Sequence, residues 1–584
     1  MNGAELTVLS HRFDGIARKM ANVLLRTGRS GVLNRAKDLS CCIVTRGCEL
    51  VSAAESLPIH VLSGPDMMAR SMHRYHPVLR RGDAFLENSP YHGCSHAADH
   101  TIIVPVIGDD GQHQFTVMAK AHQADIGNSQ PTTYFASAAD VYQEGALLFP
   151  SVRVQTDYEM VEDVIRMCEL RIRVPRQWRG DFLAMIGAAR VGERALLDLA
   201  EEYGWDHLRQ FGEEWLTYGE SRMAEALARL PKGQQSASST HDAMTGTPPD
   251  GLTIKASVET FPNEGRVRVD LTDNPDCIPS GLNLSEACAR SAAYLGVLNS
   301  LGVDLPHNGG ALRRIDVALR ENCIVGIPQH PTSCSLATTN IADRATAAIQ
   351  KAFAKIGDDI GMAEVGAINP PAKGVISGVD PRTGKRFINQ LFLGSTGGGA
   401  TPRGDAWLTY SHVGNGAMAY IESIEMAELH HPILVRERML LPDSEGAGTH
   451  CGAPSLRILY EAVGTDVTVV YASDGAVNPA EGIKGGLSGG PAQQQLIQAD
   501  GAIEALPSNG RFVLKPGQVV VSVGTGGGGF GPPTARAAEA VAAAVNDGLL
   551  SSARAREVYG VVIAGHAVDE TETEALRQYR EALS

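Results

Sequence analysis

No single hydrophobic core can serve this chain, because its 584 residues exceed the size at which one core stops growing. At roughly 100–200 residues per domain, the length predicts about three to five folded units. Hydrophobic residues make up 43% of the sequence and charged residues 20%, a balance that leaves enough apolar surface for folding. We therefore expect a multidomain globular chain with little disorder.

Charge and hydropathy argue against two classes of partner. The formal net charge of −15 disfavours nucleic acid, because affinity for a phosphate backbone comes from clustered Lys and Arg. The sequence contains no run of about 18 apolar residues, the length needed to cross a bilayer. Its N-terminal segment also lacks the apolar stretch of a signal peptide. We expect a cytoplasmic protein with no nucleic-acid or membrane partner.

The ten cysteines do not suggest a disulfide framework, because they are sparse for so long a chain and should stay reduced in the cytoplasm. Cys41, Cys42 and Cys48 could suggest zinc, but no paired CxxC motif follows at zinc-site spacing. Buried free thiols, which pack as small hydrophobic side chains, are the favoured interpretation.

Hydrophobic periodicity predicts a mixed α/β (α+β) fold. Apolar residues at helical spacing favour an amphipathic helix over 13–27, and two apolar runs around Thr45-Arg46-Gly47 favour a hairpin. Helical spacing returns over 161–230, with an interruption at Pro175, and over 336–355. The segments typical of strands are 252–260, 266–271, 456–471 and 511–523.

A segment rich in Ser, Thr, Gly, Gln and Pro at 233–251 lacks periodicity and predicts a domain boundary. We therefore expect three regions: an N-terminal α+β region (1–232), a central α/β region (251–440), and a C-terminal β-rich region with a glycine-rich loop and terminal helices (441–584). No internal repeat of fixed period is visible.

A predicted hairpin forms the sharpest candidate for a site. Strand-like runs at 101–107 and 115–121 flank Asp110-Gly111, and a two-residue turn there would pair positions whose numbers sum to 221. Pro105 cannot donate a ladder hydrogen bond, so we expect the first strand to be an edge strand or to be bulged there.

Histidines and aspartates gather at one end of this hairpin. In the expected register Asp99 faces His122 and His96 faces Asp125, with directly opposed Cβ atoms roughly 5 Å apart. His and Asp without thiolate favour Zn, Mn or Fe, and such an ion polarises a carbonyl or lowers the pKa of bound water. The alternative is that these side chains cap turns and hydrogen-bond the backbone.

Three further histidines lie near this hairpin. His92 and His100 each stand four residues from His96, so they would share a helical face with it and remain reserve ligands. His113 lies beside the turn and is expected to be exposed.

Motifs in a fixed order along most of the chain resemble the hydantoinase B/oxoprolinase family. They are Lys37-Asp38-Leu-Ser-Cys41, Pro90-Tyr-His-Gly-Cys-Ser-His96-Ala-Ala-Asp99, Ala121-His-Gln-Ala-Asp125-Ile-Gly127, Tyr142-Gln-Glu-Gly145, Val174-Pro175 with Arg179-Gly-Asp181, Leu441-Pro-Asp-Ser-Glu-Gly-Ala-Gly448, and Gly526-Gly-Gly-Gly-Phe-Gly531.

The resemblance implies a hydantoinase B-like fold and one divalent transition metal. The family's aspartate, its His-x-x-Asp pair and its downstream histidine correspond to Asp38, His96, Asp99 and His122. Asp125 and His122 are then the expected catalytic residues, with Asp125 accepting a proton or orienting His122.

Expected substrate contacts follow from the same motifs, although the surroundings differ from the family pattern. Ser89 replaces the usual Asp, Cys94-Ser95 stand where Gly-Thr is common, and Gln123 replaces a frequent His. The residues expected to contact substrate are Tyr91, His92, His412, Asn415, Gly527 and Gly528.

The glycine run that begins at Gly524 nominally fits GxGxxG after a strand, but Phe530-Gly-Pro-Pro533 precedes the next helix. No Lys-Ser/Thr pair of a phosphate-binding loop follows any glycine run, so we expect no nucleotide site. Two alternatives remain for this run and for 394–399: a tight structural turn, or a loop of exposed backbone near the active site.

The resemblance also implies a partner, an ATPase subunit of the hydantoinase A type with an actin/hexokinase-like fold. That subunit would use ATP to phosphorylate the substrate, and the metal subunit would complete the reaction within a hetero-oligomer. We expect this chain to be the metal-dependent subunit of a cyclic amide hydrolase. The alternatives are an ATP-dependent ketone carboxylase and a scaffold that only organises the ATPase.

Overall fold

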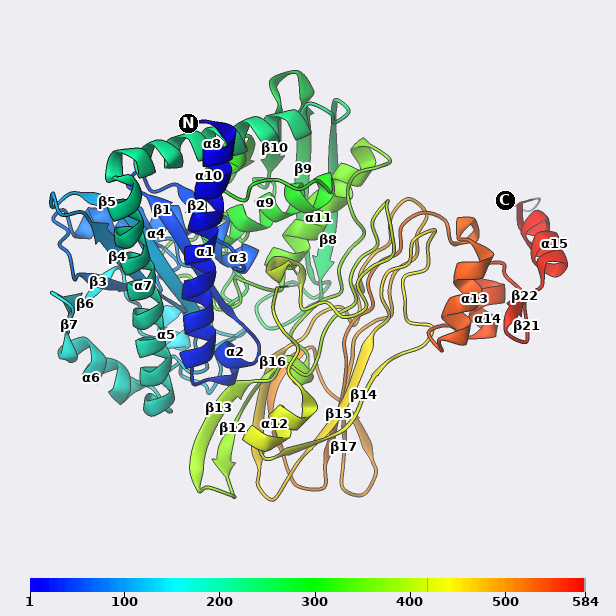
Figure 1. The fold of residues 1–584 in the computed structure, drawn as a ribbon. Coiled ribbons are helices and arrows are strands. Elements are labelled where there is room, and N and C mark those ends of the chain that lie inside the picture. Colours follow the sequence, from blue (N-terminus) through cyan, green and yellow to red (C-terminus); the bar gives the residue numbers. More distant parts are fainter. Residues whose placement is uncertain (417, 582–584) are drawn as a thin grey trace.

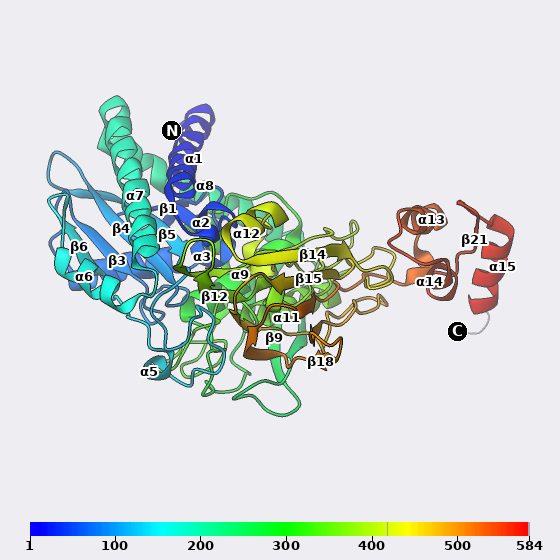
Figure 2. The ribbon, with the colours of Figure 1, turned by 90° about the horizontal axis from the view of Figure 1, so that it is seen from below.

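The computed structural model describes residues 1–416 and 418–581. Helices and a large sheet from the N-terminal third lie at one end of an elongated molecule, and the last helices project at the other (Figure 1). The view from below shows the same projection (Figure 2). Helices and several separate sheets confirm the predicted mixed α/β, multidomain fold, while the three predicted domain limits stay a prediction.

A seven-stranded sheet of order β2-β1-β5-β4-β3-β6-β7 organises the N-terminal region. Its strands are β1 (Leu39–Thr45), β2 (Leu50–Ser52), β3 (Ala84–Glu87), β4 (Asp99–Ile107), β5 (His113–His122), β6 (Val152–Thr156) and β7 (Glu159–Met160). The helices of this region are α1 (Gly3–Thr27), α2 (Gly31–Asn34), α3 (Pro58–Val61), α4 (Pro65–Tyr75), α5 (Val141–Glu144), α6 (Glu162–Arg171), α7 (Pro175–Tyr203) and α8 (Trp205–Leu227).

Strand alternation gives this sheet two buried faces. Cys41 and Ile43 share a core with α1 and α7, which cross one face of the sheet (Figure 1). Cys42 and Val44 pack on the other face with α4. Cys41, Cys42 and Cys48 are buried free thiols, as predicted, and burial raises the pKa of Cys42 to about 12.

The predicted hairpin forms in the predicted register. Asp99 pairs with His122, and the numbers of paired residues sum to 221 until a bulge between Val106 and Ile107. The edge-strand alternative for Pro105 is wrong, because β4 lies between β5 and β3. The ladder with β3 extends no further than Ile103, so the missing N–H of Pro105 interrupts no bond on that side.

The central region holds a four-stranded sheet of order β11-β10-β9-β8. The predicted linker at 233–251 is wrong in its first half, which forms edge strand β8 with an exposed polar face. The helix expected from 336 begins only at Ile341, after Asn340 with φ +41°. The elements are β8 (Gly233–His241), β9 (Leu252–Phe261), β10 (Arg266–Asp270), β11 (Ile315–Ala318), α9 (Glu286–Leu301), α10 (Gly309–Leu312) and α11 (Ile341–Ile356).

Two further sheets share one hydrophobic core and form a sandwich. The predicted strands at 456–471 and 511–523 each split between these sheets, at turns through Gly464 (φ +69°) and Gly517 (φ +89°). The elements are β12 (Val375–Asp380), β13 (Lys385–Gln390), β16 (Val467–Ala472) and β19 (Asn509–Leu514) in one sheet, β14 (Ile433–Leu440), β15 (Leu456–Ala462), β17 (Gln493–Ile497), β18 (Ile503–Ala505) and β20 (Val519–Val523) in the other, with α12 (Ile424–His430) beside them.

Extended segments run side by side between this sandwich and the C-terminal helices (Figure 1). We call residues 397–399, 446–452, 482–490 and 526–529 the glycine bundle, because their backbones pack directly on one another. A Cβ atom on Gly527 would lie 1.8 Å from the Gly398 oxygen. The backbone of both glycine runs is buried against neighbouring backbone, which contradicts the alternative of a loop of exposed backbone and agrees with a structural role.

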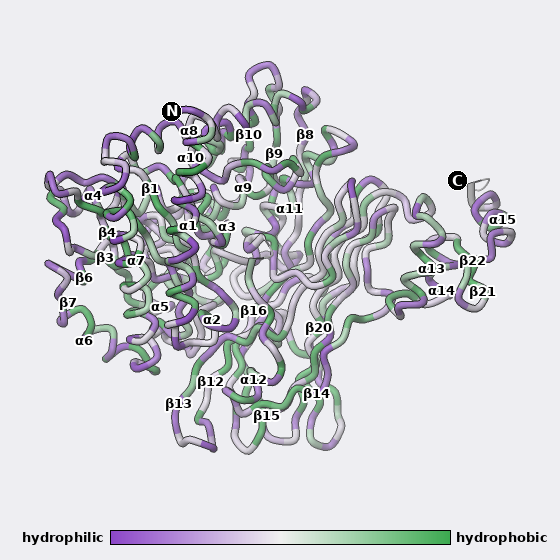
Figure 3. The backbone as a smooth tube through the Cα atoms, in the orientation of Figure 1, coloured by the Kyte–Doolittle hydropathy of each residue, from purple (hydrophilic) through white to green (hydrophobic). Residues whose placement is uncertain are grey.

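The chain ends in a small helical unit that contains α13 (Ala538–Asn546), α14 (Ser552–Glu557), the hairpin β21 (Ile563–Ala564) and β22 (Ala567–Val568), and α15 (Glu570–Glu581). Hydrophobic positions concentrate in the packed strands and helices, while α15 is largely hydrophilic (Figure 3). Among the described residues, no helix is both long enough and apolar enough to cross a membrane.

Candidate metal centre

The sheet order brings three predicted ligands to one end of neighbouring strands. Asp99 begins β4, His122 ends β5, and Asp38 directly precedes β1. Strand β5 lies between β1 and β4, so these three ends are neighbours. The His122 N–H donates to the Asp38 carbonyl at 3.1 Å, so the main chain ties the two residues together. Lys37, with φ +57°, turns the chain into the strand at this point.

His96 reaches the same end of the sheet through a tight turn, in which the Asp99 N–H donates to the His96 carbonyl at 3.1 Å. Gly93 begins this approach with φ +103°, and a Cβ atom there would lie 2.4 Å from the Met67 Cβ. Only glycine fits, so the Gly-Cys-Ser-His sequence fixes how His96 enters the site.

Three side chains converge in what we call the His/Asp cluster: His96, Asp99 and His122. His96 Nε2 and His122 Nδ1 each lie 3.1 Å from Asp99 Oδ1. One potential ligand atom from each residue lies within 4.8 Å of the others, and all three side chains are buried.

The hydrogen bonds around His96 indicate that a metal ion or a proton must lie between His96 and Asp99. His96 Nδ1 donates to the Ser335 carbonyl at 2.8 Å, so in the neutral ring Nε2 carries a lone pair. That buried Nε2 has no hydrogen-bond partner among the described residues, and it faces the Asp99 carboxylate. A lone pair against a carboxylate is repulsive unless a metal ion or a proton lies between them, so the donor set fits a metal.

The charges of the cluster reinforce this requirement. Burial opposes ionisation of Asp99, but His60 and His96 outweigh it and hold the pKa of Asp99 well below its usual range. Burial likewise opposes protonation of His96, yet Asp99 raises the pKa of His96. The cluster therefore holds a buried carboxylate that attracts positive charge.

Asp38, the fourth predicted ligand, stands beside the cluster without joining its closest group. Asp38 Oδ1 lies 3.8 Å from His60 Nε2, which in turn lies 3.1 Å from Asp99 Oδ2. No sequence pattern pointed to His60, because it lies in α3, outside the motifs that surround the β4–β5 hairpin.

Asp125 does not oppose His96, because the ladder ends at the Asp99–His122 pair. Its Oδ1 accepts from Arg173 Nη1 at 3.1 Å and from the Gly127 N–H at 3.0 Å, and its Oδ2 accepts from the Arg173 N–H at 2.6 Å. Both carboxylate oxygens are thus engaged in holding the loop after β5 to the chain before α7.

The remaining histidines of this region point elsewhere. His92 lies between Ser89 Oγ and Tyr75 OH at 2.8 and 2.9 Å. His100 packs among Trp178 and Phe149, and burial lowers its pKa to about 3. The expectation that His113 is exposed is wrong, since it is half-buried against His73, and burial lowers its pKa to about 4.

The structure separates the expected substrate contacts. The Tyr91 hydroxyl donates to the Thr332 carbonyl at 2.5 Å. The N–H groups of Gly527 and Gly528 donate at 2.9 Å to the carbonyls of Ala453 and Glu364, which lie beside the glycine bundle. These two glycines therefore have no free donor to offer a ligand.

Tyr134, in the loop between β5 and α5 of the N-terminal region, contacts the cluster, whereas His412 and Asn415 lie in the central region. Tyr134 stacks on His122 with ring centroids 5.1 Å apart, and burial and the charges of Asp38 and Asp99 raise its pKa. His412 Nδ1 lies 3.1 Å from Asp343 Oδ1, and Asn415 ends the buried turn that follows His412. Tyr134 and Asp343 carry no sequence signal, since their contacts depend on tertiary packing.

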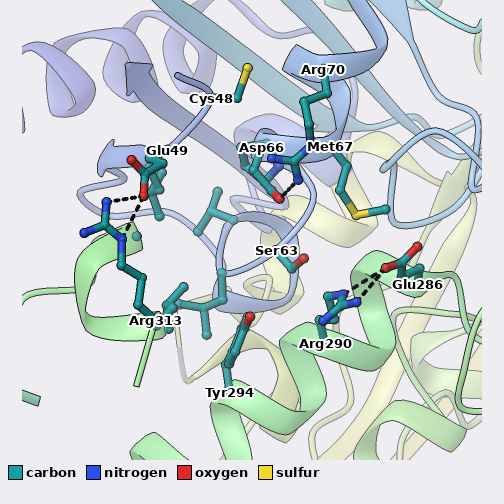
Figure 4. A pocket seen from close by; sticks show the side chains of 16 residues that line it. Cys48, Glu49, Ser63, Asp66, Met67, Arg70, Glu286, Arg290, Tyr294 and Arg313 are labelled. Atoms are coloured by element: carbon teal, nitrogen blue, oxygen red, sulfur yellow. Dashed lines mark hydrogen bonds and ion pairs between the residues drawn. The ribbon is translucent and has the colours of Figure 1, made fainter. Parts of the chain in front are cut away.

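A cavity of about 360 Å³ lies beside α3, the helix that carries His60 (Figure 4). Val61, from the helix that carries His60, lines it, as do Arg70, Arg290 and Arg313. Each of these arginines is already paired with a carboxylate, Asp66, Glu286 and Glu49 respectively (Figure 4). The described residues that line the cavity therefore leave no unpaired arginine for a ligand.

Comparison with known proteins agrees with the predicted resemblance. The family model described as hydantoinase B/oxoprolinase matches residues 2–533. Caprolactamase subunit beta of Pseudomonas jessenii is 30% identical over 580 residues, which cover 98% of both chains. 5-Oxoprolinase 1 of Arabidopsis thaliana is 24% identical over 90% of this chain and 42% of that protein.

Solved structures give the same result. The crystal structure of ATP-dependent caprolactamase from Pseudomonas jessenii matches with a TM-score of 0.88 and 26% identity, over 99% of this chain and 100% of that one. Nucleotide-free acetone carboxylase matches with a TM-score of 0.87 over 99% and 83% of the two chains, and its 17% identity shows the fold alone. The chain therefore belongs to the hydantoinase B/oxoprolinase family.

Proposed function

We propose that this chain is the metal-dependent catalytic subunit of an ATP-dependent cyclic amide hydrolase. The observation that carries the proposal is the buried His/Asp cluster, in which His96 Nε2, without a hydrogen-bond partner among the described residues, faces the Asp99 carboxylate. The names of caprolactamase subunit beta and of the oxoprolinases support a lactam, hydantoin or oxoproline type of substrate.

One divalent ion, Zn, Mn or Fe, suits this set of nitrogen and oxygen donors. His96, Asp99 and His122 would hold it, with Asp38 as the adjoining carboxylate. When bound, the ion would polarise a substrate oxygen or lower the pKa of a water molecule. The chain's own contribution is to orient the imidazoles through Ser335 and Thr133 and to cover His122 with the Tyr134 ring.

Phosphorylation explains why such an enzyme needs ATP. An unactivated amide is a poor electrophile, whereas phosphorylation of its oxygen gives an imidate phosphate whose carbon is attacked by water. Cleavage of the C–N bond then opens the ring and leaves an acyl phosphate, and a second water releases phosphate and leaves a carboxylate. The backbone N–H groups of Gly527 and Gly528 are hydrogen-bonded within this chain and so do not bind phosphate. We therefore assign ATP to a partner subunit of the hydantoinase A type, in a cytoplasmic hetero-oligomer. The word "subunit" in the name of the caprolactamase relative supports a partner.

The second candidate is an ATP-dependent ketone carboxylase, which the match to acetone carboxylase favours at the level of fold. A scaffold without chemistry is the third, and the intact ligand set of the His/Asp cluster speaks against it.

The test supplies the complete complex separately with hydantoins, 5-oxoproline, lactams and simple ketones, with bicarbonate present or rigorously removed. We expect ring opening that requires ATP and does not require bicarbonate, followed as a gain of water mass. Ketones that gain the mass of CO2 while every ring stays closed would replace this proposal with the carboxylase.

A further inference from the structure

His60 is a buried histidine that none of the sequence motifs includes. It lies in the short helix α3, is 2% exposed, and its Nε2 approaches Asp99 Oδ2 at 3.1 Å and Asp38 Oδ1 at 3.8 Å. It is thus the side chain that joins the two aspartates of the predicted ligand set.

The hydrogen bonds of Ser40 determine which nitrogen of His60 carries the proton. Ser40 Oγ accepts from the Leu57 N–H at 3.0 Å, and its other contact is His60 Nδ1 at 3.1 Å. In the neutral ring the hydroxyl donates to Nδ1, so the hydrogen sits on Nε2. A doubly protonated ring also carries hydrogen there, so Nε2 donates to Asp99 in either state.

A second donor occupies the same oxygen of Asp99. The Lys120 ammonium can only donate, and it donates to Ser95 Oγ at 3.2 Å. The Ser95 hydroxyl therefore directs its own hydrogen to Asp99 Oδ2. With His60 on the same atom, Oδ2 has two donors, while Oδ1 faces His96 and His122.

We propose that His60 is a positioning residue that occupies Asp99 Oδ2, so that Asp99 presents Oδ1 alone to the cation of the His/Asp cluster. His60 also separates Asp38 from Asp99, two carboxylates that would otherwise repel each other in a buried site. The inference rests on the metal of the proposed function, and it assigns to this chain a control of how that metal is ligated.

The test measures the affinity of the chelator-stripped full chain for Zn²⁺, by competition with a chromophoric chelator, and its thermal midpoint without metal. His60→Leu removes both ring nitrogens, whereas His60→Gln returns an amide N–H near the position of Nε2. His100→Leu is the matched control, because His100 is a buried histidine that directly follows Asp99 but packs against Trp178.

We expect His60→Leu to weaken Zn²⁺ binding by about 10–100-fold, the usual effect of losing a group that orients a ligand. His60→Gln should restore most of that affinity, and His100→Leu should keep it. The inference is overturned if His60→Leu binds as tightly as the natural chain, if the Gln variant is as weak as the Leu variant, or if His100→Leu is equally weak. A natural chain with no affinity for Zn²⁺, Mn²⁺ or Fe²⁺ contradicts the proposed function as well, which separates the two failures.

Discussion

The His/Asp cluster and the glycine bundle both begin as conspicuous motifs, yet they fold by opposite means. In the cluster the strands place side chains from separate motifs around one point, with His96 and His122 each 3.1 Å from one oxygen of Asp99. In the bundle the glycines have no side chains, and backbones approach until a Cβ on Gly452 would lie 2.0 Å from the Gly527 oxygen.

The difference teaches how to interpret such motifs. A His-x-x-Asp motif brings side-chain donor atoms that need a partner when they are buried, so they can still bind a ligand in the folded chain. A glycine run brings only backbone groups, which bind a ligand only if the fold leaves them free. Here the fold uses them, so the bundle serves architecture, whereas the cluster keeps the donor atoms on which the proposed chemistry rests.

The largest effect should follow Asp99→Asn. Exchanging the anionic ligand for a neutral amide removes the charge that attracts the cation, so turnover by the complete complex should fall further than the about 10–100-fold typical of outer residues. The measurement is product formation at saturating ATP, with circular dichroism as the check of folding. Turnover near that of the natural chain would remove Asp99 from the chemistry.

Gly527→Ala should break the other side of the comparison. The added Cβ would meet the Gly398 oxygen at 1.8 Å, and backbone cannot move aside as a flexible side chain can. We expect a loss of stability of more than about 3 kcal/mol, at or beyond the usual range for overpacking, measured by denaturant unfolding.

Gly187→Ala is the matched control for this variant. Gly187 lies in the middle of α7, and a Cβ atom added there would meet nothing within 4 Å, so Ala should stabilise the helix by about 0.5–1 kcal/mol. Equal behaviour of the two variants would contradict the packing of the bundle.

Lys373 gives a smaller effect that depends on pH. Burial lowers its pKa from 10.5 to about 8, against the opposing charges of Asp38 and Asp343. Between about 8 and 10.5 the unfolded chain binds more protons here than the folded chain, so this group makes stability rise with pH across that window. Below it, Lys373→Met should be more stable than the natural chain by about 1–3 kcal/mol.

The check is denaturant unfolding of both chains from pH 7 to 10.5, read as a difference, which should shrink through the window. A constant difference would show that the ammonium is not desolvated. Burial of Lys373 near Asp38 would then cost the folded chain no stability.

Asp125→Asn should have the smallest effect and distinguishes a structural carboxylate from a catalytic one. Because Asp125 pairs with Arg173, we expect a loss of about 1–3 kcal/mol of stability with unchanged metal content. Arg173→Met should lose a similar amount. Unaltered stability with strongly reduced turnover would return Asp125 to the role of base.

Local patterns predicted much of the fold. The register predicted for β4 and β5 is confirmed, but the two-residue turn predicted at Asp110-Gly111 is wrong. Ile107 pairs with His113, and the Gly108 N–H donates to the Gln112 carbonyl around a three-residue loop. The bulge between Val106 and Ile107 restores the predicted pairing further along the strands. The β8 strand was missed because its exposed face is polar, which hides the alternation of apolar and polar residues typical of a strand. The segment 456–471 was predicted as one strand because its turn glycine lies within an apolar run.

The site was predictable where one hairpin supplies its residues. His96, Asp99 and His122 come from β4, β5 and the turn before them, so spacing alone could bring them together. His60 and Tyr134 reach the same place from other segments, and only tertiary packing decides that.

Metal content of the purified chain tests the central claim most directly. Elemental analysis of the natural chain and of His96→Ala, purified side by side, should give about one transition-metal ion per natural chain and far less in the variant, because two remaining close donors hold an ion poorly. Equal metal in both chains, or none in the natural chain after growth with Zn, Mn and Fe, would contradict the assignment of the His/Asp cluster.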